Sequence, residues 1–204
     1  MRRFAFAFVL ILSAALQHAA SQAPELITPE YLAEQYTAAP NAPSSVVIAG
    51  KDEPGERLVV TGRTVDGTKP VAGVSIYVFH TDIEGLYARD VNSSYAELHP
   101  RLQGAIRTDE QGRYRYETIR PAGYNNGTAH VHYVVKAGGY KPRLIALEFE
   151  DDPIHVSRRK AGQPEVPNDG PVCRSVPDCV VISPVMRDTE GVWHAARDIQ
   201  MIRQ

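Results

Sequence analysis

The segment RYRYETIRPAGYNNGTAHVHY, residues 113–133, predicts two β-strands joined by a loop. Its second strand carries the sequence AHVH at 129–132. Side chains two residues apart on a strand project from the same face, so His130 and His132 stand together while Val131 faces the other way. Two imidazoles at this spacing can occupy adjacent positions on one metal ion.

Two tyrosines come directly after predicted strands. Tyr124 follows the strand that ends at Ile119, and Tyr87 follows the strand that ends at His80. Taken alone, each is typical of a buried tyrosine with a hydrogen-bonded hydroxyl, because the chain contains 10 tyrosines. A lone His-x-His strand is likewise more often a polar sheet face than a metal site. The combination of both pairs is what predicts a metal centre.

Short β-rich segments separated by turn signals continue in both directions from this stretch. Asp66-Gly67 and Gly138-Gly139 are turn signals of this kind. The expected strands are 57–65, 73–80, 113–119, 129–137, 143–150, 180–183 and 192–202. This spacing, with little helical periodicity, predicts an all-β fold, an antiparallel β-sandwich. Two long irregular stretches, 88–104 and 151–178, are expected to form loops around the metal site.

The first residues have the pattern of a secretory signal peptide. A basic start at Arg2-Arg3 precedes an apolar run that ends near Leu16, and small residues follow it. We expect a signal peptide over residues 1–21, with cleavage after Ser21 or Ala23. The apolar run is too short to span a bilayer, which argues against a membrane anchor. The predicted location is therefore secreted or periplasmic.

The next segment, residues 22–56, is expected to be a short N-terminal arm. It contains one helix signal, in which Thr28 is the N-cap and Pro29 is the first helical residue. Several prolines and a glycine then prevent its continuation. Residues 57–204 are predicted to form the β-sandwich domain itself.

Export changes the interpretation of the two cysteines. In an oxidising compartment, Cys173 and Cys179 predict a disulfide that closes a small loop. The net charge of −2 offers no basic stripe, so nucleic acid is not an expected partner. No membrane association is predicted after signal cleavage, and the sequence does not indicate an oligomeric state.

Five motifs follow one another in a fixed order. They are EGLY at 84–87, RTDEQGRY at 107–114, IRPAGY at 119–124, AHVH at 129–132 and FEDDP at 149–153. Tyr124 lies 37 positions after Tyr87, and six more positions lead to His130. No single motif is specific. The ordered set resembles the intradiol ring-cleavage dioxygenases, the catechol and protocatechuate dioxygenase group, in an exported form.

This resemblance implies one non-haem ferric ion, Fe(III), as the cofactor. The ligands that it implies are two tyrosinates and two histidines: Tyr87, Tyr124, His130 and His132. A free tyrosine has a pKa near ~10, so phenolate ligation at neutral pH needs a highly charged cation. Hard anionic oxygen donors favour Fe(III) over softer ions. The residues are therefore consistent with what the resemblance implies.

The resemblance also implies a reaction. A catechol-type diol would displace Tyr124, whose released tyrosinate would accept a substrate proton as a general base. O2 would then cleave the ring between the two hydroxyl-bearing carbons, and a muconate-type diacid would leave. The expected partners are thus a small catecholic substrate and O2. Aromatic compound catabolism is the corresponding process.

The chain departs from the family pattern in the substrate pocket. An arginine expected before the histidine pair is replaced by Gly127, and a glutamine expected on the next strand is replaced by Ala146. Loss of a cation at developing negative charge can cost ~10²-fold in rate. Three arginines are candidate replacements: Arg89, Arg107 and Arg143.

Two alternatives remain open at this point. The first is a non-catalytic metal- or ligand-binding β-sandwich module, which the missing arginine and glutamine favour, because a fold alone does not determine activity. The second is zinc or copper at the histidine pair, which leaves the two tyrosines unexplained. Four further histidines are expected on the surface or on a strand face: His80, His99, His155 and His194.

Overall fold

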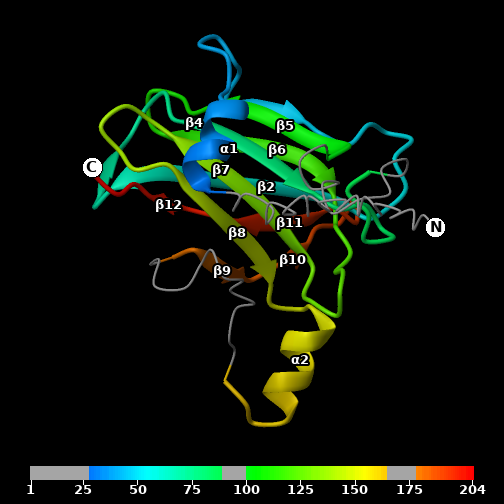
Figure 1. Ribbon diagram of the computed structural model, residues 1–204. Helices are drawn as coiled ribbons and strands as arrows, with labels where there is room; N and C mark the ends of the chain where they lie inside the picture. The colour runs from blue at the N-terminus through cyan, green and yellow to red at the C-terminus, as the bar shows by residue number, and fades with distance from the viewer. Residues whose placement is uncertain (1–27, 89–99, 165–177) are drawn as a thin grey trace, which may run out of the picture.

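The computed structural model describes residues 28–88, 100–164 and 178–204. In this part of the chain, two β-sheets form a sandwich, and two short helices lie outside it (Figure 1). The seven-stranded sheet contains, in order, β1 (Ser45–Val47), β6 (Arg113–Ile119), β2 (Arg57–Asp66), β11 (Trp193–Ala196) and β10 (Met186–Arg187), with β3 (Lys69–Pro70) and β12 (Ile199–Gln200) also paired to β2. The five-stranded sheet contains, in order, β5 (Leu102–Arg107), β4 (Ser75–His80), β7 (His130–Lys136), β8 (Arg143–Phe149) and β9 (Val180–Ser183).

The predicted all-β sandwich is confirmed, with one correction to its strand directions. The long central pairs β2–β6, β4–β5, β4–β7 and β7–β8 are antiparallel as predicted. Four short strands pair in parallel, namely β1 with β6, β11 and β12 with β2, and β9 with β8, whereas β3 and β10 pair antiparallel. The sheets are therefore mixed, because segments distant in the chain return to their edges.

The core lies between the two sheets and is built by strict alternation. On β7, Val131, Tyr133 and Val135 pack inward with residues of β2, β4, β6 and β8. His130 and His132 occupy the intervening positions and face outward, as the sequence predicts. The outer face of the five-stranded sheet is therefore the face that carries the candidate site.

Several expected element boundaries hold and others do not. The strands expected at 113–119 and 180–183 are observed with those bounds. The strand expected at 192–202 is divided into β11 and β12. The stretch 151–178, expected to be irregular, begins with helix α2 (Pro153–Lys160). Its start has the same signature as the helix that was predicted, an N-cap side chain followed by proline, here Asp152.

The segment before β2 is part of the sandwich. Helix α1 (Pro29–Gln35) forms where predicted, and the Thr28 hydroxyl accepts a hydrogen bond from the Tyr31 N–H at 3.1 Å. Leu32 and Ala33 are buried against the outer face of the five-stranded sheet. β1 then adds a strand beside β6. The domain boundaries at residues 21 and 56 stay predictions.

Two further predictions concern residues that the structure does not describe. The signal peptide falls within residues 1–27, and Cys173 falls within 165–177. The disulfide therefore stays a prediction, although its second member, Cys179, is buried at the start of β9. Among the helices of the described residues, none has the length and apolar character needed to cross a membrane.

Candidate metal centre

Tyr87 lies just after a tight loop that follows β4. The Asp82 N–H donates to the Leu86 carbonyl at 2.9 Å, which closes the loop. Gly85 has a φ of 77°, a left-handed conformation that glycine adopts without steric cost. The Tyr87 side chain is 6% exposed, and its carbonyl accepts the Arg101 N–H at 2.7 Å. The loop therefore holds Tyr87 firmly on both sides.

Tyr124 begins a tight turn that leads to β7. Asn125 and Asn126 have φ values of 50° and 59°, and the Gly127 N–H donates to the Tyr124 carbonyl at 2.8 Å. Two consecutive left-handed residues are typical of a type I′ turn, in which asparagine is favoured. This turn reverses the chain within four residues and brings Tyr124 back beside His130.

The two histidines are oriented by their neighbours. The Nδ1 of His130 lies 2.9 Å from the Thr128 carbonyl, which can only accept, so Nδ1 donates this hydrogen bond and Nε2 is the nitrogen that lies beside His132. The ring of Phe79 stacks on His132, with centroids 4.8 Å apart and planes 23° apart. Phe79 lies directly opposite His132 across β4 and β7. The sheet register therefore fixes this contact.

The four predicted residues lie together. The hydroxyl oxygens of Tyr87 and Tyr124 are 3.3 Å apart, and the Nε2 atoms of His130 and His132 are 2.9 Å apart. Ring centroids are 5.3 Å apart for Tyr124 and His130, and 6.2 Å apart for Tyr87 and His132. Residues separated by up to 45 positions thus form one cluster of two phenols and two imidazoles.

This cluster fits a single metal ion. Two metal–donor bonds of ~2.1 Å that meet at a right angle place the donors ~3.0 Å apart, close to both observed separations. In the described part of the chain, no group of three or more His, Cys, Asp and Glu side chains could hold a metal. A metal at the cluster would therefore need the tyrosines, and phenolate oxygens suit a hard, highly charged cation.

The electrostatics of the histidines favour the form that binds metals. Burial lowers the pKa of His132 well below its usual value, and His130 and His80 lower it further. The neutral imidazole is the metal-binding form of histidine. At neutral pH His132 therefore needs to lose no proton before it can bind.

Comparison with known proteins agrees with this geometry. The family model described as dioxygenase matches residues 26–161, about two thirds of the chain. The chain is similar to the protocatechuate 3,4-dioxygenase beta chain of Burkholderia cepacia, with 38% identity over 111 residues, 49% of this chain and 47% of that one. It is also similar to catechol 1,2-dioxygenase of Acinetobacter baylyi, with 29% identity over 135 residues, 55% of this chain and 43% of that one. The chain belongs to the intradiol ring-cleavage dioxygenase family.

These similarities cover only part of each curated relative, so they identify the family and not the whole protein's activity. The chain spans about half the length of the curated relatives it matches. A solved dioxygenase domain of a carbohydrate-binding fusion protein from Streptomyces sp. SirexAA-E has a TM-score of 0.57 and 21% identity, covering 82% of this chain and 94% of that one. At this identity the structural likeness shows the fold. Members of the family are oxidoreductases that use non-haem iron, so the cluster lies in a fold associated with such a metal.

The two candidate arginines that the structure describes do not face the cluster of tyrosines and histidines. Arg107 binds the carbonyls of Ala38, Ala39 and Gly73 at 2.6, 3.0 and 2.7 Å, so its guanidinium ties the N-terminal segment to the sheet. Arg143 lies opposite Val135 and points between the sheets, where it donates to the Gln200 carbonyl at 2.6 Å. Both candidates are therefore wrong. The third, Arg89, lies outside the described residues.

Two of the histidines expected on the surface or on a strand face are buried, and only His80 of these two lies on a strand. His80 is fully buried on the inner face of β4, with its Nε2 2.7 Å from the Thr118 hydroxyl. His155 is fully buried in α2, 2.7 Å from Glu148. His194 is exposed beside Asp188, as expected. His99 lies outside the described residues.

Sequence reasoning missed the residues that support the tyrosines and histidines. Phe79 stacks on His132, and the Asp82 loop precedes Tyr87. The motif DIEG at 82–85 recurs as DEQG at 109–112 and DTEG at 188–191, which was a readable signal for this loop.

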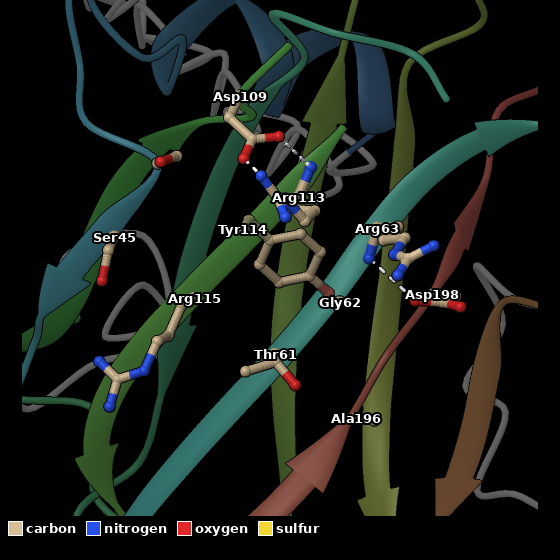
Figure 2. A pocket seen from close by; sticks show the side chains of 11 residues that line it. Ser45, Thr61, Gly62, Arg63, Asp109, Arg113, Tyr114, Arg115, Ala196 and Asp198 are labelled. Carbon is tan, nitrogen blue, oxygen red and sulfur yellow. Dashed lines mark hydrogen bonds and ion pairs between the residues drawn. The ribbon is translucent and has the colours of Figure 1, made fainter. Parts of the chain in front are cut away.

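A hollow lies on the outer face of the seven-stranded sheet. It has a volume of about 700 Å³ and lies over β2 and β6 (Figure 2). Its two carboxylates have partners: Asp109 binds the Arg113 guanidinium at 2.9 Å, and Asp198 accepts the main-chain N–H of Arg63 at 2.9 Å. This hollow is on the opposite side of the sandwich from the tyrosine–histidine cluster, so it does not contribute to the candidate metal centre.

Proposed function

We propose that the protein is an exported Fe(III) intradiol dioxygenase that cleaves catechol-type diols with O2 to muconate-type diacids. The observation that carries this proposal is the convergence of two tyrosine hydroxyls, 3.3 Å apart, and two histidine Nε2 atoms, 2.9 Å apart, on one face of the sheet. In this proposal Tyr87, Tyr124, His130 and His132 are the iron ligands. Bound Fe(III) would supply a Lewis acid that favours the deprotonated forms of the phenols and of the diol.

The chain gives its two tyrosines different roles. Tyr87 is buried and its main chain is held on both sides, so it serves as a fixed ligand. Tyr124 is half-buried and begins an exposed turn, so it can leave its position when a diol enters. Its hydroxyl oxygen then accepts the proton that the diol releases. Tyr124 is therefore the catalytic residue of the proposal.

A row of aromatic side chains lies beside the cluster. Tyr36 stacks on Tyr77 with centroids 4.4 Å apart, and Phe79 lies 5.6 Å from Tyr77 and 6.0 Å from Tyr87. Leu32 of α1 covers the same apolar area. These rings are packed against one another and against α1, so they exclude water from one side of the site.

The first test is the visible spectrum of the iron-loaded protein. Tyrosinate ligation of Fe(III) gives a visible charge-transfer band, which should shift when catechol is added without oxygen. Admission of oxygen should then consume O2 and yield the ring-opened diacid. The variant Tyr87→Phe should lose iron or colour, whereas Tyr140→Phe, which removes a hydroxyl bound to Asp66 far from the site, should keep both. A protein that stays colourless after addition of ferric iron contradicts the proposal.

The absence of a cation at Gly127 favours a second candidate, a metal- or ligand-binding module without turnover. In the described residues, neither Arg107 nor Arg143 supplies the missing charge at the site. The two functions are separated by oxygen uptake with a panel of catechols. Iron binding and colour without any uptake would support the binding module.

A further inference from the structure

The loop before Tyr87 is one of three loops with the same construction in the described residues. In each, the aspartate N–H donates to the carbonyl four residues later, and the glycine N–H donates back to the aspartate carbonyl. One carboxylate oxygen also accepts the N–H groups two and four residues later. The loops are Asp82–Leu86, Asp109–Arg113 and Asp188–Val192. They are built as three-residue turns that end in a left-handed glycine.

Only the first of these three aspartates is buried. The side chain of Asp82 is 1% exposed, whereas those of Asp109 and Asp188 are 28% and 37% exposed. A buried carboxylate is costly unless it is paired and hydrogen-bonded. Turn formation alone does not require that burial, because the two exposed copies make the same turn. The burial of Asp82 therefore calls for a separate explanation.

The Asp82 carboxylate holds the chain on both sides of Tyr87. One oxygen accepts the Leu86 N–H, at 3.1 Å. The other lies 3.4 Å from the guanidinium of Arg101. The main-chain N–H of Arg101 donates to the Tyr87 carbonyl at 2.7 Å. A single carboxylate thus connects the residue before Tyr87 with the residue that binds its carbonyl.

The same residue also fastens the loop that carries Tyr124. The Asp82 carbonyl accepts the Ala122 N–H at 3.0 Å, and the Thr81 hydroxyl donates to the Ala122 carbonyl at 2.7 Å. The two loops meet without spare room, because a Cβ at Gly85 would lie 2.7 Å from the Gly123 carbonyl oxygen. A shift of the Asp82 loop would therefore move both tyrosines.

We propose that Asp82 is a positioning residue that sets the separation of the Tyr87 and Tyr124 hydroxyls. This inference rests on the proposed function, in which both tyrosines bind iron. Asp82 acts through the two loops and itself touches neither the iron nor the substrate. Residues that orient metal ligands in this way typically change metal affinity ~10–100-fold when replaced.

The test compares the same change in two copies of the loop. Asp82→Ala and Asp188→Ala each remove the carboxylate from one turn of the full chain, and ferric iron is then titrated into each protein. We expect Asp82→Ala to weaken iron binding ~10–100-fold and to shift the charge-transfer band. Asp188→Ala should keep the affinity and the band of the original protein. Asp82→Asn keeps one oxygen for the two N–H groups and should recover most of both.

A second pair of variants covers the case in which Asp82→Ala does not fold. Arg101→Gln removes a guanidinium that Asp82 shares with Glu53, and Arg113→Gln removes the corresponding partner of Asp109. Glu53→Gln keeps the contact of Arg101 with Asp82 and serves as the control for the loss of the Glu53 ion pair. Only Arg101→Gln should shift the band. Equal affinities and bands in the Asp82 and Asp188 variants, or in the two arginine variants, overturn the positioning role alone. An unchanged chain that binds no ferric iron overturns the proposed function and this inference with it.

Discussion

Tyr87 and Tyr124 hold their hydroxyl oxygens 3.3 Å apart, but the two side chains differ in their freedom to move. Tyr87 is 6% exposed and packs its ring 6.0 Å from that of Phe79. Tyr124 is half-buried and precedes two left-handed asparagines, Asn125 and Asn126. Both asparagines adopt this conformation readily and form an exposed turn, so Tyr124 is not held by core packing on that side. Under the proposed function, this difference favours Tyr124 as the exchangeable ligand.

Replacement of the two tyrosines should therefore have different kinetic effects. Tyr124→Phe removes the proton acceptor, so we expect kcat for catechol cleavage to fall ~10²-fold or more while iron remains bound. Tyr87→Phe removes a fixed ligand, so iron affinity should fall first. Iron content and steady-state oxygen uptake measure the two effects separately. A Tyr124→Phe protein with unchanged kcat would show that another group accepts the proton.

His80 gives the stability of the fold a predictable dependence on pH. Burial lowers its pKa from 6.5 to about 4, and its ring nitrogens contact the Thr81 carbonyl and the Thr118 hydroxyl at 2.7 Å each. Between these pH values the unfolded chain binds a proton that the folded protein does not, so the free energy of unfolding falls as the pH falls. The loss from pH 7 to pH 4 amounts to about 3 kcal/mol for this residue.

Denaturant unfolding at several pH values tests this dependence. His80→Gln should flatten the decline of the unfolding free energy between pH 6.5 and pH 4, because the variant has no imidazole to protonate in the unfolded chain. Equal slopes in the His80 variant and the original chain would contradict the role given to burial.

At the scale of the elements, the sequence predicts well which face of a strand a side chain occupies, and where a helix begins, when the signal lies in neighbouring residues. The outward position of His130 and His132 follows from strand alternation, and α1 follows from Thr28 and Pro29. The buried position of Arg143 between the sheets cannot be predicted in the same way. A shift of one residue in register turns a side chain to the other face, and only the pairing with Val135 places this arginine between the sheets.

The site could likewise be predicted only in part. The four residues of the tyrosine–histidine cluster can be predicted from the ordered motifs, because each lies on a strand or shortly after the end of one. The contact of Phe79 with His132 depends on the pairing of β4 with β7. The hold of Asp82 on the Tyr124 loop depends on two loops 40 positions apart. Contacts of this kind arise from tertiary packing, which local patterns do not specify.

Helix α1 should contribute measurably to stability although it is short. Leu32 is 3% exposed and packs with Tyr77, Phe79 and Val134 on the sheet. We expect Leu32→Ala to lower the free energy of unfolding by about 2 kcal/mol, the lower end of the range for buried leucines, since a terminal helix can shift to fill the space. Glu34→Ala, on the exposed side of the same helix, should have little effect. Denaturant unfolding of both variants measures the difference.

At the scale of the whole molecule, segments from both ends of the chain converge on the five-stranded sheet. Helix α1 covers the outer face of this sheet beside the cluster, and β9 closes one edge by pairing in parallel with β8. The Cys179 carbonyl accepts the Ala146 N–H at 2.7 Å, and Ala146 lies opposite His132. The chain around Cys179 is thus only one strand away from the candidate metal centre.

A disulfide between Cys173 and Cys179 would therefore stabilise the edge next to the site. It would close a loop of about seven residues, for which the loss of unfolded-chain entropy gives about 2 kcal/mol. Under our proposal of export, the linked form is the one that persists outside the cytoplasm. The double variant Cys173→Ala, Cys179→Ala should accordingly unfold at lower denaturant concentration than the original chain and retain its visible band. Peptide mass analysis without reductant should find the two cysteines in one species lighter by two hydrogens, whereas free thiols at both positions in the exported protein would contradict the disulfide.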